Sequence, residues 1–233
     1  MSGHPRSERT EMRITIAGGH GKIALRLTRL LHERGAEVFG LVRKPEHVPE
    51  VEAAGAHPLE VDLEHTGRDE ITRSLRGTDA LVFAAGSGPG SGVERKYTVD
   101  RDGSVLLASA AEEAGVPRFV QVSTMGAGRS PDPDAGEVWQ AYIDAKTSAE
   151  QDLRSRNLDW TVLRPGALTE DPGRGLVTLS SPPVTPGRVP RQDVAAVLAE
   201  LLTTRRGGGR TLELTEGNTP IAEAVAALGA PTG

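Results

Sequence analysis

The residues of this chain best suited to chemistry lie in the stretch Tyr142-Ile143-Asp144-Ala145-Lys146. Residues four positions apart share one face of a helix, so the Lys146 ammonium would lie near the Tyr142 phenol and favour its ionised form. A phenol in that setting can donate or remove a proton at a carbonyl or an alcohol. The alternative is a surface helix that carries an interfacial tyrosine and an exposed lysine.

Two hydroxyl groups are expected beside this tyrosine. Ser123 and Thr124 follow the apolar run 119–122, and either could orient the oxygen of a carbonyl substrate. Either could instead cap a loop. The catalytic candidates are therefore Tyr142, Lys146, Thr124 and Ser123.

A glycine-rich turn separates the apolar run 14–17 from an amphipathic helical pattern. Gly18 can adopt the tight turn, Gly21 lets the backbone approach a phosphate, and the small Ala24 lets a helix pack closely on the strand. The first N–H groups of that helix would then face an anion. An ordinary turn is the alternative, but the position between strand and helix predicts a pyrophosphate site. Its residues would be Gly18, Gly19, His20, Gly21, Lys22 and Ile23.

The ends of the following strands indicate which dinucleotide would bind. Arg43 and Lys44 follow the second strand, where two cations suit a 2′-phosphate, so NADP is favoured over NAD. A solvated basic strand end would leave that choice open. Asp62, which precedes Leu63, could accept a hydrogen bond from the adenine amino group or cap a turn. Room for ribose and pyrophosphate is expected at the small residues Ala84, Ala85 and Gly86.

Short apolar runs alternate with helical patterns along most of the chain. Strands are predicted at residues 13–17, 38–42, 57–61, 80–84, 119–122, 160–163 and 211–214. Helices are predicted at 21–33, 45–54, 69–75, 93–114, 138–156, 192–202 and near 220–228. Runs that are apolar on both faces are typical of parallel strands covered by helices. We therefore expect an α/β fold with a doubly wound parallel sheet of the Rossmann type.

The composition changes after Arg164, where proline and glycine become frequent. Residues 165–191 are expected to be mostly loop, and 164–228 to contribute a small substrate cap to a single domain that spans 12–228. The polar residues 1–11 are expected to form a disordered tail.

Composition also limits the partners. A net charge of −5 argues against nucleic acid, and no stretch approaches the ~18 apolar residues that span a bilayer. The absence of cysteine excludes thiolate chemistry and fits a reducing cytoplasm, and the histidine spacing predicts no metal site. The long helices expected at 93–114 and 138–156 could form a dimer interface or be solvated, so a monomer and a homodimer both remain open.

Together these motifs resemble the short-chain dehydrogenase/reductase superfamily from about residue 12 to 228. The resemblance is carried by Gly18-x-x-Gly21-x-x-Ala24, the strand end Ser123-Thr124, Tyr142-x-x-x-Lys146 and Leu163-Arg164-Pro165-Gly166. The chain is most similar to the atypical and extended NAD(P)-binding branches, which include an epimerase/dehydratase group and NmrA-like relatives. The resemblance implies NADP, with the nicotinamide near Pro165, Gly166 and Leu168. It also implies that Tyr142 is the acid/base, that Lys146 positions ribose, and that Thr124 or Ser123 polarises the substrate oxygen.

Two features depart from this family. Asp100 stands where extended members carry an asparagine, which puts a proton relay through that helix in question. Only about 70 residues follow Arg164, so a small substrate is expected rather than a nucleotide sugar. The motifs, the resemblance and the short segment after Arg164 together predict an NADP-dependent oxidoreductase acting on a small carbonyl or alcohol. The alternatives are an epimerase or dehydratase that recycles NADP, and a redox sensor that binds NADP without catalysis.

Overall fold

A nine-stranded sheet forms the centre of the molecule, whose computed structural model describes residues 11–88, 90–130 and 133–229. Its strand order is β3-β2-β1-β4-β5-β6-β10-β8-β11, and the first seven strands are parallel. The parallel strands are β1 (Arg13–Ala17), β2 (Glu37–Val42), β3 (Ala56–Glu60), β4 (Ala80–Phe83), β5 (Arg118–Val122), β6 (Asp159–Pro165) and β10 (Arg210–Glu216). The predicted doubly wound Rossmann sheet is confirmed.

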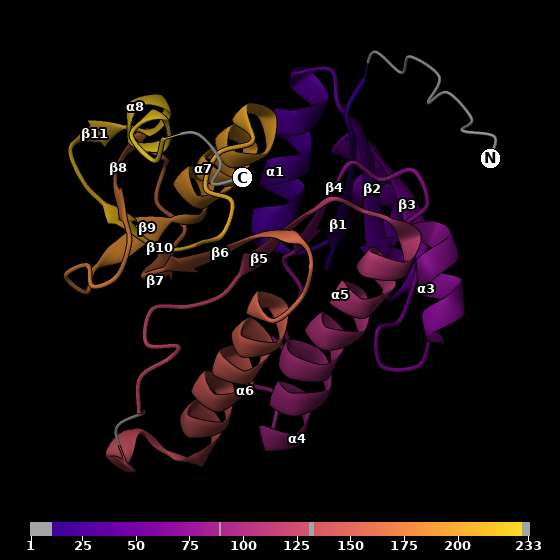
Figure 1. Ribbon diagram of the computed structural model, residues 1–233, viewed down its shortest axis with the longest axis horizontal. Coiled ribbons are helices and arrows are strands. Elements are labelled where there is room, and N and C mark those ends of the chain that lie inside the picture. The colour runs from indigo at the N-terminus through magenta and orange to yellow at the C-terminus, as the bar shows by residue number, and fades with distance from the viewer. Residues whose placement is uncertain (1–10, 89, 131–132, 230–233) are drawn as a thin grey trace.

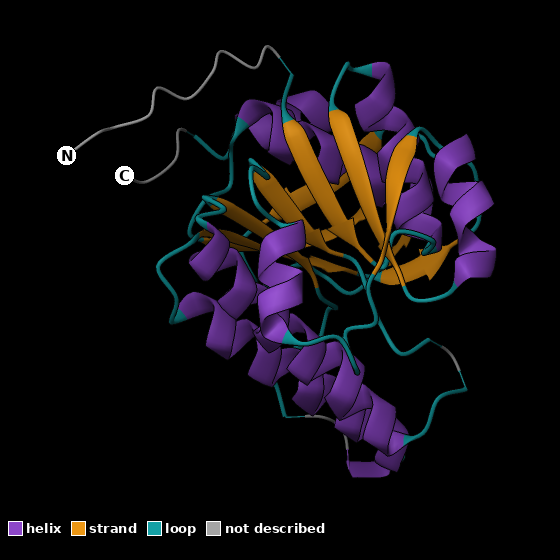
Figure 2. Ribbon diagram, turned by 90° about the vertical axis from the view of Figure 1, so that its right-hand side faces the viewer, coloured by secondary structure: helices purple, strands orange, loops and turns teal. Residues whose placement is uncertain are grey.

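Helices cover both faces of the sheet (Figures 1 and 2). One face carries α1 (Lys22–Glu33) and α7 (Arg191–Thr204), with α2 (Val48–Ala53) and α8 (Ile221–Ala226) at its margins. The other face carries α3 (Arg68–Ser74), α5 (Gly103–Ala114) and α6 (Glu137–Arg154). The bounds of these helices agree with the predicted ones to within a few residues, except for α5, which begins ten residues after its predicted start.

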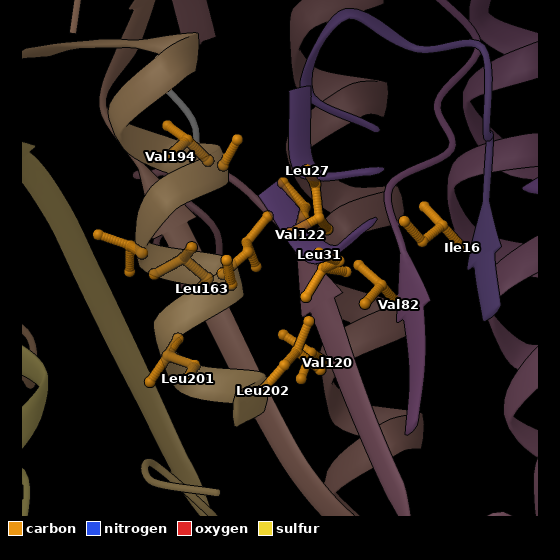
Figure 3. Packing of buried hydrophobic residues seen from close by; sticks show 14 of the residues in the cluster. Ile16, Leu27, Leu31, Val82, Val120, Val122, Leu163, Val194, Leu201 and Leu202 are labelled. Carbon is orange, nitrogen blue, oxygen red and sulfur yellow. The ribbon is translucent and has the colours of Figure 1, made fainter. Parts of the chain in front are cut away.

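The core is divided by the sheet into two apolar layers. Along β4, Val82 packs toward α1 and α7 while Leu81 and Phe83 pack toward α3 and α5, as the period of two in a strand requires. Figure 3 shows the first layer, in which Leu27 and Leu31 of α1 meet side chains of α7 and of the strands. Burial on both faces explains why these strands read as continuous apolar runs.

One predicted helix is interrupted. The expected helix at 93–114 consists of α4 (Val93–Arg95), a π-helical segment (Lys96–Asp102) and α5. A π segment shifts the phase of the side chains that follow it, and such segments are frequent at functional sites. Here it brings Lys96 and Asp100 to the loop that follows β4.

The expectation of loop over 165–191 is wrong at three short strands. They are β7 (Ala167–Thr169), which pairs with β9 (Arg188–Pro190), and β8 (Leu176–Ser180), which runs antiparallel to β10 and to β11 (Thr219–Pro220). In β8, which lies between β10 and β11, Val177 is buried while its neighbours Leu176 and Thr178 are half-buried and exposed, so the period of two of a strand holds here.

The proposed cap segment divides into two parts. Strand β10 extends the parallel sheet beside β6, and α7 packs on α1, so both belong to the main layers. Only 166–190 is left to cover a substrate, which stays a prediction. The tail expected at 1–11 lies outside the described residues except for Glu11. Within the described ranges, no helix is long and apolar enough to cross a bilayer.

Candidate functional site

The glycine turn lies between the carboxyl ends of β1 and β4, where the strand order of the sheet reverses. Gly18 has φ +76°, and a Cβ on it would lie 2.6 Å from the Cα of Ala85. The Gly21 amide donates to the Gly18 carbonyl at 2.7 Å, and Gly21 precedes α1 without a side-chain cap. The turn therefore presents backbone donors to a ligand at the start of a 12-residue helix.

Gly19 has a structural role in the turn, and its contact with the pyrophosphate stays a prediction. Its amide donates to the Leu41 carbonyl at 2.9 Å, and a Cβ on it would lie 2.9 Å from the Cα of Gly40 in β2. Gly19 therefore lets the turn pack against the second strand, and the glycine inside that strand is the sequence signal for this close approach.

A pocket of about 260 Å³ extends from this turn along the ends of β2, β3 and β4. The predicted cofactor residues that line it are Gly18, His20, Gly21, Arg43, Asp62, Leu63, Ala84, Ala85 and Gly86. The glycine turn fits a dinucleotide, because a Cβ on Gly18 would collide with the Ala85 backbone in the pocket wall and the uncapped start of α1 supplies backbone donors. The other predicted cofactor residues are not among those lining this pocket; they are Gly19, Lys22, Ile23, Lys44, Lys146, Pro165, Gly166 and Leu168.

Two of the predicted cations pair with carboxylates elsewhere. Lys44 is 3.3 Å from Glu46, and Lys22 is 2.8 Å from Glu170. Arg26 and Arg191 also pair with Glu170, which ties the segment after β7 to α1 and α7. Phosphate contacts by either lysine stay predictions that require these exposed pairs to open.

Sequence reasoning missed a charged cluster at the rim of the pocket. Glu64 accepts from Arg95 at 2.8 Å, from Thr98 at 2.7 Å and from Arg43 at 3.4 Å. Burial alone would raise the pKa of Glu64, but Thr98 and Arg95 outweigh it and lower the pKa below its ordinary value. An ionised carboxylate thus lies between the guanidinium groups of Arg43 and Arg95. No local sequence motif predicts this cluster, because Arg95 lies 31 positions along the chain from Glu64.

Asp62 behaves mainly as a turn residue. Its Oδ1 accepts from the Glu64 amide at 2.9 Å and its Oδ2 lies 3.0 Å from Nδ1 of His65. Burial would raise the pKa of Asp62, but these hydrogen bonds lower it. Both carboxylate oxygens of Asp62 are therefore engaged within the local turn. A turn is the alternative to the adenine contact that the sequence leaves open. The adenine contact stays a prediction.

Tyr142 and Lys146 lie on one face of α6, with the ammonium 5.8 Å from the centre of the phenol ring. Lys146 is buried, pairs with Asp100 at 3.2 Å and donates to the Val122 carbonyl at the end of β5. Burial would lower the pKa of Lys146, but Asp100, Tyr142 and Glu150 together outweigh it and raise the pKa. Asp100 also accepts from the Ser87 amide at 3.1 Å, so it anchors the lysine to the loop after β4.

The two hydroxyl candidates separate in the structure. Ser123 is buried and donates to Glu150 at 2.6 Å, and the Arg164 Nε donates to the same oxygen at 2.9 Å. Ser123 therefore serves a buried charged network, because Glu150 lies on the inward face of α6. Thr124 is half-buried and donates only a long bond of 3.3 Å to the Met125 carbonyl, and its role in orienting a substrate oxygen stays a prediction.

The segment after β6 lies beside Thr124. The Met125 amide donates to the Pro165 carbonyl at 3.0 Å, and the Gly166 amide donates to Leu214 of β10 at 2.8 Å. Leu168 is 37% exposed. These backbone bonds hold the segment at the carboxyl edge of the sheet, while its contact with a nicotinamide stays a prediction.

A Rossmann domain that binds a dinucleotide is the class of protein that this turn, pocket and sheet define. A family model described as NAD(P)H-binding matches residues 18–205. The chain belongs to this NAD(P)H-binding family, among the atypical short-chain dehydrogenases/reductases, which confirms the resemblance seen in the sequence.

Three relatives illustrate the family. The protein named uncharacterized sugar epimerase YhfK of Bacillus subtilis (strain 168) is 35% identical, over 93% of this chain and 100% of the relative. The structure of the oxidoreductase ylbE from Lactococcus lactis is 31% identical with a TM-score of 0.80, over 93% of this chain and 96% of that one. A short-chain dehydrogenase/reductase from Veillonella parvula DSM 2008, solved with NADP, shares the fold at 18% identity and a TM-score of 0.72, over 90% and 96% of the two chains.

Substitution of Gly18 by alanine is expected to weaken NAD(P)H binding about tenfold, or roughly 1.4 kcal/mol. The new Cβ would press on the Ala85 backbone and displace the turn. Fluorescence titration of NADPH measures the effect. Gly35→Ala is the control, because Gly35 has a similar φ of +79° but open space around its Cβ position. An equal loss of NADPH affinity in the two variants would contradict the proposed role of the glycine turn in binding the cofactor.

Proposed function

We propose that this protein is an NADP-dependent oxidoreductase that acts on a small carbonyl compound or the corresponding alcohol. The observation that carries the proposal is the position of Tyr142, beside the buried, charged Lys146. Both residues lie at the carboxyl edge of the sheet, the same edge as the glycine turn. Support also comes from the relative named as an oxidoreductase.

The side chains divide the work of carbonyl reduction among them. Bound NADPH would supply a hydride to the carbonyl carbon. The Tyr142 hydroxyl donates a proton to the carbonyl oxygen, and Lys146 stabilises the phenolate that remains. Asp100 keeps Lys146 charged and in place, and Thr124 orients the substrate oxygen. Alcohol oxidation uses the same groups in the opposite direction.

Arg43 supports NADP over NAD, because its guanidinium lines the pocket at the end of β2 and suits a 2′-phosphate. We expect Arg43→Gln to weaken NADPH binding about tenfold and to change NADH binding less than about twofold. Arg34→Gln is the control, since Arg34 follows the last turn of α1, at the opposite end of that helix from the glycine turn, and pairs with Glu200. Calorimetric titrations of both nucleotides compare the variants, and an equal loss for NADH would refute a 2′-phosphate role.

The function is tested by incubating the protein with NADPH and a panel of small aldehydes, ketones and oxo acids. Loss of NADPH absorbance with at least one compound is the expected result. A protein that binds NADPH but oxidises it with none of them would favour the redox sensor. Failure to bind either nucleotide would overturn the proposal.

A second candidate is an epimerase or dehydratase that recycles a tightly held NADP. The name of the Bacillus subtilis relative, a sugar epimerase, favours it. Such an enzyme would retain nucleotide through purification, and mass spectrometry of the denatured protein would detect it. An oxidoreductase that exchanges its cofactor at each turnover would be purified largely without nucleotide.

A further inference from the structure

The π-helical segment carries a buried lysine that the proposed reaction does not use. Lys96 is 8% exposed, and its ammonium donates to the Ser87 hydroxyl at 2.9 Å and to the Gly88 carbonyl at 3.1 Å. An ammonium has three N–H donors. Two are directed at the loop after β4, so one remains for a ligand.

The charge around Lys96 is not balanced. Among the residues that the structure describes, no carboxylate oxygen lies within 4.0 Å of its Nζ, whereas Lys146 has Asp100 at 3.2 Å. Asp100 therefore compensates Lys146, and among the described residues Lys96 has no carboxylate of its own at that distance. Burying a cation is unfavourable unless an anion compensates it. The unbalanced charge therefore suits an anionic ligand.

The position of Lys96 indicates which ligand that is. Its ammonium lies 5.5 Å from the centre of the Tyr142 ring, and the Ser87 to which it donates lines the dinucleotide pocket. The pyrophosphate is expected between the glycine turn and residues 84–86, and a 2′-phosphate at Arg43. All of these line the dinucleotide pocket, whereas Lys96 is not among the residues that line it. The anion nearest Tyr142 would therefore belong to the substrate.

We propose that Lys96 binds a carboxylate of the substrate, and that the substrates are oxo acids or the corresponding hydroxy acids. The inference builds on the proposed function, in which Tyr142 protonates the carbonyl oxygen. Lys96 holds the carboxylate while Tyr142 meets the carbonyl, so the acid is bound in one orientation. Lys96 is a specificity-determining residue and transfers no proton.

Binding tests this proposal without turnover. The protein is titrated calorimetrically with 2-oxopentanoate and 4-oxopentanoate and with the neutral amide of each, in the presence and absence of NADP⁺. We expect at least one acid to bind about tenfold more tightly than its amide. Lys96→Met should abolish that preference, and Lys96→Arg should keep most of it because the charge remains.

Ser87→Ala is the matched control for a merely structural role. It removes the hydroxyl to which the Lys96 ammonium donates but leaves the ammonium itself, so the preference for acids should persist. Retention of the preference in Lys96→Met would overturn the proposal, as would equal binding of acids and amides by the unaltered protein. Neither result would affect the oxidoreductase proposal, which is judged separately by NADPH binding and by NADPH oxidation with the panel of aldehydes, ketones and oxo acids.

Discussion

Replacement of Tyr142 by phenylalanine is expected to lower turnover roughly 10²- to 10⁴-fold, the usual contribution of a positioned acid/base. The ring and its packing against Trp139 remain, so the fold and the cofactor pocket should be unchanged. NADPH affinity should therefore stay within about twofold. Steady-state rates of NADPH oxidation and nucleotide titrations measure the two quantities separately.

Tyr97→Phe is the matched control, because the chain contains only two tyrosines. Tyr97 lies in the π segment, and its pKa is raised by burial and by the neighbouring Asp144 carboxylate. It contacts Arg101 rather than either buried lysine. We expect full turnover in this variant. Full turnover in Tyr142→Phe would instead contradict the proposed role of Tyr142 as the acid/base.

Removal of the buried carboxylate in Glu150→Ala is expected to lower the free energy of unfolding by about 3–5 kcal/mol. Glu150 is fully buried and receives hydrogen bonds from Ser123, Arg164 and Arg154. Without it, the buried Arg164 guanidinium would be left without its counter-ion. Denaturant unfolding followed by circular dichroism gives the difference.

Glu112→Ala provides the comparison for a carboxylate nearer the surface. Glu112 pairs with Arg156 at 2.7 Å, but its side chain is 34% exposed, so solvent screens the interaction. A loss of about 0–1 kcal/mol is expected there. Similar small losses in both variants would show that the network around Glu150 contributes little to stability.

The sequence predicted the parallel sheet and the glycine cradle because both depend on local patterns. Apolar runs on both faces specify covered strands, and the position of Gly18 after the first run specifies the turn. The roles of Ser123 and Glu64 depend instead on side chains far along the chain. Ser123, which follows β5, donates to Glu150 on α6, and Glu64, which follows β3, accepts from Arg95 beyond the next strand.

The π segment explains a further limit. A regular helix over 93–114 would fix the direction of each side chain by its position, but the wider turn shifts that phase. Lys96 could therefore not be assigned to the loop after β4 from spacing alone. Its contacts with Ser87 and Gly88 became visible only in three dimensions.

A helix acquires a wide turn of this kind when it accommodates one additional residue between fixed ends. Each residue of an α-helix turns the chain by about 100°. Deleting one residue between Lys96 and Asp100 would rewind the segment while α5 stayed in register. Asp100 would keep its place beside Lys146, but Lys96 would rotate away from the loop. The anion preference of this fold is thus separable, by a single deletion, from its acid/base pair.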